Sequence, residues 1–118
     1  MNAKKVLRNL GKQDVIIGSS AHPLTSYLAI KEAKKQKALS VVEIRDLWPE
    51  SAIDTGILKN STIIKISYWF ESFIYKKAKL INVLTPSFRD KLICDKKVPE
   101  RKVIFIPNAA DFSLAKKL

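Results

Sequence analysis

The sequence is poor in the residues that build disulfides and metal centres. It contains one cysteine, Cys94, and one histidine, His22, in 118 residues. A single cysteine excludes a disulfide within the chain and a metal site made of several cysteines, so a reducing compartment suits this protein. We therefore expect no metal ion, and we interpret Cys94 as a small packed residue without a redox role.

Long hydrophobic runs are also missing. A membrane-spanning helix needs about 20 apolar residues in succession. The most apolar region, residues 61–79, is interrupted by Lys65 and Glu71, and the N-terminal residues lack the apolar segment of a signal peptide. The sequence thus predicts a chain that does not cross a membrane.

Acidic residues are scarce relative to basic ones, with 11 Asp and Glu against 22 Lys and Arg and a net charge of +11. Such an excess attracts nucleic acid, anionic membranes or phosphorylated ligands. Arginine, which recognises bases and phosphates better than lysine, supplies only four of these charges. The charge permits a small basic nucleic-acid-binding α/β module, which we keep as the alternative function. No nucleic-acid-binding motif accompanies the basic residues, so we expect no nucleic acid partner. A phosphate-binding or response-regulator-like domain would need its own first strand and an acidic cluster, and neither is seen.

Short apolar runs alternate with helical patterns along the chain. The runs predict four strands, at about residues 14–18, 40–45, 80–84 and 102–106. Helices are expected between them, in the order β-α-β-α-α-β-α-β after a leading basic helix. This order predicts an α/β class: a Rossmann-like parallel sheet, incomplete, with helices on both faces.

The most regular helical pattern covers residues 61–78. Its apolar residues recur at helical spacing and are expected to face the core: Ile63, Ile66, Phe70, Phe73 and Ile74.

Small, polar or charged residues follow each predicted strand: Ser19, Ser20 and His22; Arg45, Asp46, Trp48 and Glu50; Ser87; and Asn108 with Asp111. Open α/β sheets bind ligands at the carboxyl ends of their strands, so these residues form the candidate site. Two interpretations of the first turn stay open, an anion site made by backbone N–H groups and plain helix capping.

The stretch "EIRDLWPES", residues 43–51, also permits both a ligand-binding and a structural interpretation. Asp46 either holds a ligand hydroxyl or acts as a base near it, or else it forms a structural ion pair with Arg45. Trp48 shapes the turn or stacks on a ligand ring, and Glu50 is expected to cap the next helix. Asn108 and Asp111 are interpreted mainly as residues that hydrogen-bond their own turn.

Four stretches resemble the N-terminal domain of family 4 glycosyltransferases, in particular the bacterial subgroup that builds O-antigen, capsule or colanic-acid-type polysaccharides. They are "DVIIGSSAHPLT", "VVEIRDLWPESAIDTGILKN", "AKLINVLTPSFRDKL" and "KVIFIPNAADF". The second is the most specific. The last resembles the Ile-Pro-Asn-Gly-Val-Asp element that leads to the second domain, with Ala109 where glycine is usual.

The resemblance implies the GT-B architecture and transfer of a sugar from a nucleotide-sugar to an acceptor, often a polyprenyl-diphosphate-linked saccharide at the bacterial inner membrane. In this interpretation Ser19, Ser20, His22, Arg45, Trp48 and Glu50 bind acceptor, Asp46 is catalytic, and Ser87, Asn108 and Asp111 lie at the hinge or cleft. No cofactor or metal is implied beyond the nucleotide-sugar.

The same resemblance predicts that the 118 residues form one partial domain. Residues 107–118 would begin the interdomain hinge. The glycine-rich loop, the first strands and the donor-binding domain of the family are not found in the sequence, so we expect the isolated chain to be inactive. We expect a cytoplasmic location, peripheral at the inner membrane, with weak lysine-mediated contact to anionic lipid.

Overall fold

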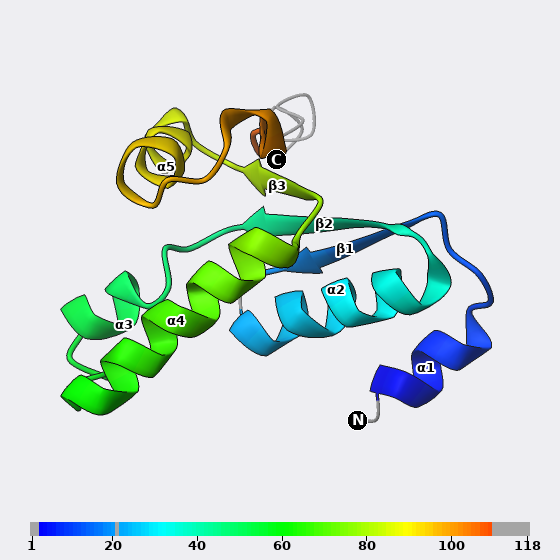
Figure 1. Cartoon of the computed structure of the whole chain (residues 1–118), viewed down its shortest axis with the longest axis horizontal. Coiled ribbons are helices and arrows are strands. Elements are labelled where there is room, and N and C mark those ends of the chain that lie inside the picture. Colours follow the sequence, from blue (N-terminus) through cyan, green and yellow to red (C-terminus); the bar gives the residue numbers. More distant parts are fainter. Residues whose placement is uncertain (1–2, 21, 110–118) are drawn as a thin grey trace, which may run out of the picture.

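The protein is seen here in a computed structural model that describes residues 3–20 and 22–109 (Figure 1). Four strands form one parallel sheet in the order β1-β2-β3-β4. They are Val15–Ser19 (β1), Leu39–Ile44 (β2), Leu80–Val83 (β3) and Val103–Phe105 (β4). Each lies within one residue of its predicted bounds at either end, so the predicted α/β parallel sheet is confirmed.

Helices connect the strands, as the alternating pattern indicates. They are Ala3–Asn9 (α1), Pro23–Gln36 (α2), Glu50–Asp54 (α3), Ser61–Lys77 (α4) and Pro86–Asp90 (α5), and a π-helical turn, Lys91–Asp95, continues α5. The start of α4 is fixed by Asn60, whose side-chain oxygen accepts hydrogen bonds from the N–H groups of Thr62 and Ile63 at 3.0 and 3.2 Å. The end of α2 is fixed by Lys37 in the left-handed conformation.

One face of the sheet carries the core. Gly18, Val42, Ile81 and Val103 stand in register across the four strands on this face. Helix α2 approaches it so closely that a Cβ at Gly18 would lie 2.7 Å from the Cβ of Ala29. Glycine at this position therefore permits the contact between α2 and β1.

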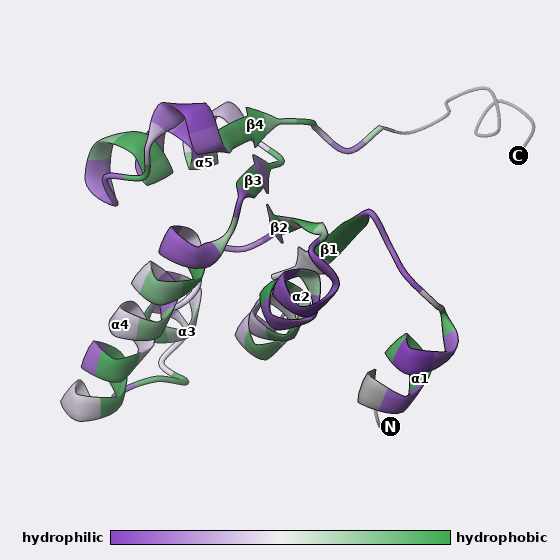
Figure 2. Cartoon of the chain, turned by 45° about the vertical axis from the view of Figure 1, so that its right-hand side comes forward, coloured by the Kyte–Doolittle hydropathy of each residue, from purple (hydrophilic) through white to green (hydrophobic). Residues whose placement is uncertain are grey.

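The helices α2, α4 and α5 all pack on this same face, which differs from the predicted cover on both faces (Figure 2). Each strand pairs with the next along the chain, and right-handed crossovers that advance in one direction return on one side of the sheet. On the opposite face, Val15, Ile17 and Leu39 are exposed, and none of the described helices covers them.

The orientation of helix α4 about its axis differs from the one that its apolar pattern predicts. The first two members of the predicted core stripe are outside: Ile63 and Ile66 are 50% and 58% exposed, and the neighbouring Trp69 is 66% exposed. Phe70 and Phe73 are half-buried, and Ile74 is buried. The inner side of α4 carries Ser67, Glu71, Ile74 and Tyr75, and its C-cap residue Ala78 is buried as well. The prediction that the stripe faces the core is thus confirmed for Ile74 and for Phe70, which packs against the core, and it is wrong for Ile63 and Ile66.

Candidate functional site

The turns after β1 and β2 are joined by hydrogen bonds at the carboxyl edge of the sheet. The N–H of Ser20 donates to the carbonyl of Glu43 at 2.8 Å. The hydroxyl of Ser20 accepts a hydrogen bond from the N–H of Arg45 at 3.0 Å. Ser20 therefore holds the chain that carries Arg45 and Asp46 against the first turn.

Arg45 and Asp46 both have exposed side chains. Neither forms an ion pair with another residue that the structure describes. Asp46 accepts a hydrogen bond from the hydroxyl of Ser51 at 2.8 Å, which fixes one carboxylate oxygen. The structural ion pair considered from the sequence is absent between these two residues, and both side chains are accessible to a ligand.

The other candidates of the first turn lie apart from Asp46. Ser19 is on the open face of the sheet, where its hydroxyl donates to Glu43 Oε1 at 3.3 Å. His22 is the N-cap of α2, and its Nδ1 accepts from the N–H of Leu24 at 3.4 Å. The capping residue is therefore the histidine and neither serine.

A small cavity opens beneath this edge, between the sheet and the inner sides of α2 and α4. Its enclosed volume is about 20 Å³, which is room for about one water molecule, and it opens toward solvent. Apolar core side chains line it together with six polar or aromatic ones: Ser20, Ser26, Asp46, Trp48, Glu71 and Tyr75. Ser26 is 1% exposed, and its hydroxyl has no hydrogen-bond partner among the described residues. A buried hydroxyl without a partner is unusual, and the space beside it has the size of a water molecule rather than of a sugar ring.

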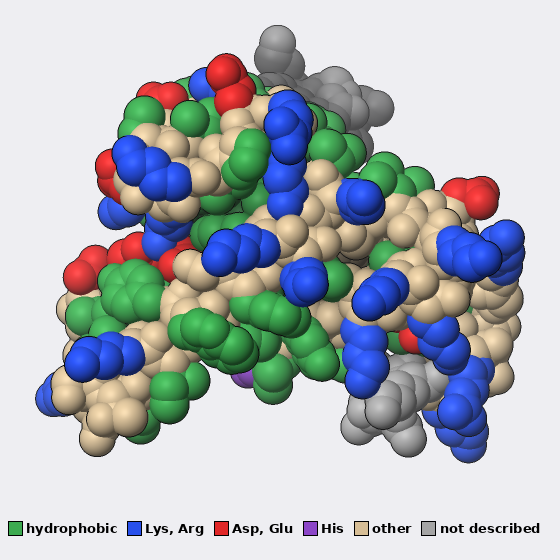
Figure 3. Space-filling model, viewed as in Figure 1, with side chains coloured by type: hydrophobic (Ala, Val, Ile, Leu, Met, Phe, Trp, Pro, Cys, Tyr) green, Lys and Arg blue, Asp and Glu red, His purple; other side chains and the backbone are tan. Residues whose placement is uncertain are grey.

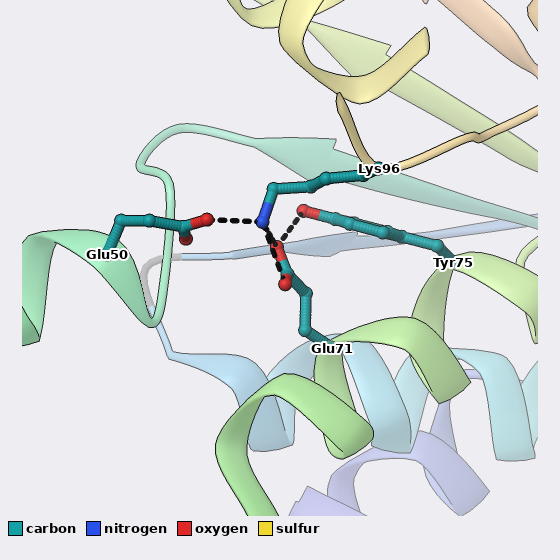
Figure 4. Close-up of polar contacts among 4 residues, drawn as sticks. All are labelled: Glu50, Glu71, Tyr75 and Lys96. Carbon is teal, nitrogen blue, oxygen red and sulfur yellow. Dashed lines mark hydrogen bonds and ion pairs between the residues drawn. The ribbon is translucent and has the colours of Figure 1, made fainter. Parts of the chain in front are cut away.

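Glu50 does not line this cavity but belongs to a partly buried polar cluster, which includes Glu71 and Tyr75 of the cavity wall (Figure 4). Glu50 pairs with Lys96 Nζ, which also contacts Glu71 Oε1 at 2.7 Å. The hydroxyl of Tyr75 donates to the same oxygen of Glu71 at 2.9 Å. We name these four residues the Lys96 cluster. The prediction that Glu50 caps α3 is wrong in one respect: Glu50 stands in the first turn, but its carboxylate bonds to Lys96.

Burial controls the protonation of the Lys96 cluster. Burial raises the pKa of Glu71, and the nearby Lys96 offsets this only in part. Burial alone would lower the pKa of Lys96, but hydrogen bonds to Glu50 and Glu71 outweigh it and raise that pKa. Burial and the adjacent charge of Glu71 raise the pKa of Tyr75, so its hydroxyl stays protonated and acts as a donor. The cluster joins α3, α4 and the π-helical turn.

The remaining candidates lie at other strand ends. Ser87 is exposed in the first turn of α5, whose N-cap is Thr85. Asn108 is exposed beyond β4. Cys94 is exposed too, so the prediction that it is a packed residue is wrong. Asp111 lies outside the described residues, as does most of the predicted hinge at residues 107–118. Of the predicted site residues, the cavity brings together Ser20, Asp46 and Trp48.

Sequence reasoning missed Ser26, Tyr75 and Lys96, and it noted Glu71 only as an interruption of an apolar run. Glu71 carried a usable signal, since a carboxylate within such a run must find a partner if it is buried. Its partner lies 25 residues away, in a segment with several lysines and no distinguishing pattern.

Comparisons with known proteins leave the family open. No protein-family model matches the chain, and no curated protein matches its sequence. Within the described part, no helix is long and apolar enough to cross a membrane.

Proposed function

We propose that this chain is part of a nucleotide-sugar-dependent glycosyltransferase of bacterial surface polysaccharide biosynthesis and contributes its acceptor-binding side. The observation that carries the proposal is the carboxyl edge of the sheet, where the exposed side chains of Arg45 and Asp46 lie beside the partly exposed Trp48. Parallel α/β sheets bind their ligands at this edge. The family resemblance of residues 43–51 supports the same assignment.

The chemistry of these side chains suits a saccharide. A sugar ring presents hydroxyls that need paired hydrogen bonds and a C–H face that packs on an aromatic ring. Ser20 supplies a hydroxyl at this edge, and Trp48 supplies the ring. The exposed guanidinium of Arg45 is suited to the diphosphate of a polyprenyl-linked acceptor.

Asp46 is the proposed general base. The acceptor hydroxyl oxygen attacks the anomeric carbon of the nucleotide-sugar, and the bond from that carbon to the diphosphate oxygen breaks. The hydroxyl proton passes to the carboxylate of Asp46, and the nucleoside diphosphate leaves with the electron pair. Asp46 has one oxygen bonded to Ser51 and the other without a described partner, which leaves an oxygen for this proton.

By the family resemblance, the nucleotide-sugar is held by residues outside this sequence. We therefore propose that the 118 residues bind acceptor but transfer no sugar by themselves. The proposed place of action is the cytoplasmic side of the bacterial inner membrane, where lipid-linked acceptors are available.

Binding of a water-soluble, short-prenyl diphosphate-linked saccharide tests the proposal. Asp46→Asn should weaken binding about tenfold, because a hydrogen bond to a charged group is lost. Asp54→Asn is the matched control, since Asp54 is also exposed but lies outside the cavity. Equal affinity of the two variants would contradict the assignment. Salt-dependent binding to duplex DNA without saccharide binding would favour the nucleic-acid alternative.

A further inference from the structure

Helices α2 and α4 lie side by side and expose a continuous apolar surface (Figure 3). Leu24 and Leu28 of α2 are 54% and 37% exposed. Ile63, Ile66 and Trp69 of α4 are exposed to a similar degree. We name these five residues the α2–α4 face.

Aromatic rings support the α2–α4 face from below. The ring of Tyr27 in α2 lies 6.0 Å from that of Phe70 and 6.3 Å from that of Phe73, both in α4. Trp69 stacks on Phe73 with 5.9 Å between ring centroids. The exposed residues are therefore held on a packed aromatic base that joins the two helices.

Positive charge surrounds this surface. Each of the two helices contains three lysines and one glutamate. Glu71 is turned inward to the Lys96 cluster, and Glu32 accepts a hydrogen bond from Gln36. Lys31, Lys35 and Lys65 are exposed, and the ammonium of Lys77 lies 5.9 Å above the ring of Phe73.

The geometry points to an anionic lipid surface as the partner of the α2–α4 face. Exposed apolar patches rimmed by polar residues mark interaction sites, and a tryptophan between apolar and charged groups suits the headgroup level of a bilayer. The lysines complement anionic headgroups while Ile63, Ile66 and Trp69 enter the interface. The lysines alone were expected to make such a contact, whereas the structure assigns it to the apolar stripe of α4. The surface is separate from the cavity, so its test does not depend on saccharide binding.

Sedimentation of the full 118-residue chain with vesicles tests the inference. We expect binding to phosphatidylcholine mixed with phosphatidylglycerol to exceed binding to phosphatidylcholine alone, and high salt to reduce the difference. Ile66→Thr should weaken binding about tenfold, because it removes apolar surface from the contact. Ile17→Thr is the matched control, since Ile17 is 64% exposed on the open face of the sheet. Lys77→Gln should weaken binding about fivefold, and Lys97→Gln less.

Tryptophan fluorescence gives a second measurement. The chain has two tryptophans, so Trp48→Phe leaves Trp69 as the reporter. Its emission should shift to the blue with anionic vesicles and be quenched by lipids with brominated acyl chains. Unchanged Trp69 emission, or equal loss of binding in Ile66→Thr and Ile17→Thr, would overturn the inference. It would also be overturned by a lipid-free dimer that Ile66→Thr converts to monomer, because a second copy would then cover the face.

Discussion

Helix α4 buries charged and polar side chains and exposes large apolar ones, which is the reverse of most surface helices. The inner side contributes Glu71 and Tyr75 to the buried Lys96 cluster, whereas the outer side exposes Ile63, Ile66 and Trp69. Charge is tolerated inside because Lys96 pairs with both carboxylates and Tyr75 supplies a further hydrogen bond to Glu71. The apolar surface outside contributes nothing to the core, and it is the basis of the lipid contact proposed above. The comparison shows that hydrogen-bonding partners, as well as hydrophobicity, decide which side of a helix is buried.

Removal of Lys96 should have the largest effect on stability. Lys96→Met leaves Glu50 and Glu71 without their shared counterion, so we expect the free energy of unfolding to fall by about 3–5 kcal/mol. Urea denaturation measures this change. Lys97→Met is the control, because Lys97 is exposed and forms no ion pair with a described residue. A loss of stability in Lys97→Met as large as that in Lys96→Met would show that the loss does not come from the ion pairs of the Lys96 cluster.

Two isoleucines of α4 test its orientation directly. Ile74 is 5% exposed, and Ile74→Ala should cost about 2–5 kcal/mol through lost packing. Ile66→Ala should change stability by less than about 0.5 kcal/mol, since Ile66 faces outward. Thermal denaturation of both variants provides the comparison. Equal destabilisation would mean that the apolar stripe faces the core after all.

Replacement of Glu71 should be milder than replacement of Lys96. Glu71→Gln keeps an oxygen for the Tyr75 hydroxyl and leaves Lys96 paired with Glu50, so we expect a change of about 1 kcal/mol or less. If urea denaturation shows Glu71→Gln to be as unstable as Lys96→Met, the described sharing of one ammonium between two carboxylates is wrong.

The same variant should alter the dependence of stability on pH. The pKa of Glu71 is raised above its ordinary value of 4.5 in the folded chain, so the folded state holds this proton more tightly than the unfolded state. The contribution of Glu71 to stability is therefore greatest at low pH and declines as pH rises from 4.5 through the raised pKa. Denaturation at a series of pH values should show that Glu71→Gln removes this decline. An unchanged pH profile would contradict the burial of Glu71 as a carboxylate.

The smallest expected effect on stability is at Asp46. Its side chain is exposed, so Asp46→Asn should change the free energy of unfolding by less than about 0.5 kcal/mol while it weakens saccharide binding. A large loss of stability together with unchanged saccharide affinity would indicate a structural role instead.

The strands could be predicted because buried parallel strands appear as short apolar runs with clear ends. The turn at Arg45 and Asp46 could also be placed, since strand order fixes the carboxyl edge. The orientation of α4 could not be predicted, because two stripes of its surface are suited to burial. Which stripe is buried depends on Lys96, far along the chain. The one-sided sheet depends on strand order, which local patterns do not reveal.

The proposed acceptor site is tested most directly by a titration of the isotope-labelled chain with a short-prenyl diphosphate-linked saccharide, followed in the ¹⁵N–¹H NMR spectrum. We predict that the amide signals that move belong to Ser20, Arg45, Trp48 and the first turn of α2, and that those of Ile63 and Ile66 on the α2–α4 face stay in place. Shifts confined to the open face of the sheet, or no shifts at saturating saccharide, would contradict the assignment of this edge as an acceptor site.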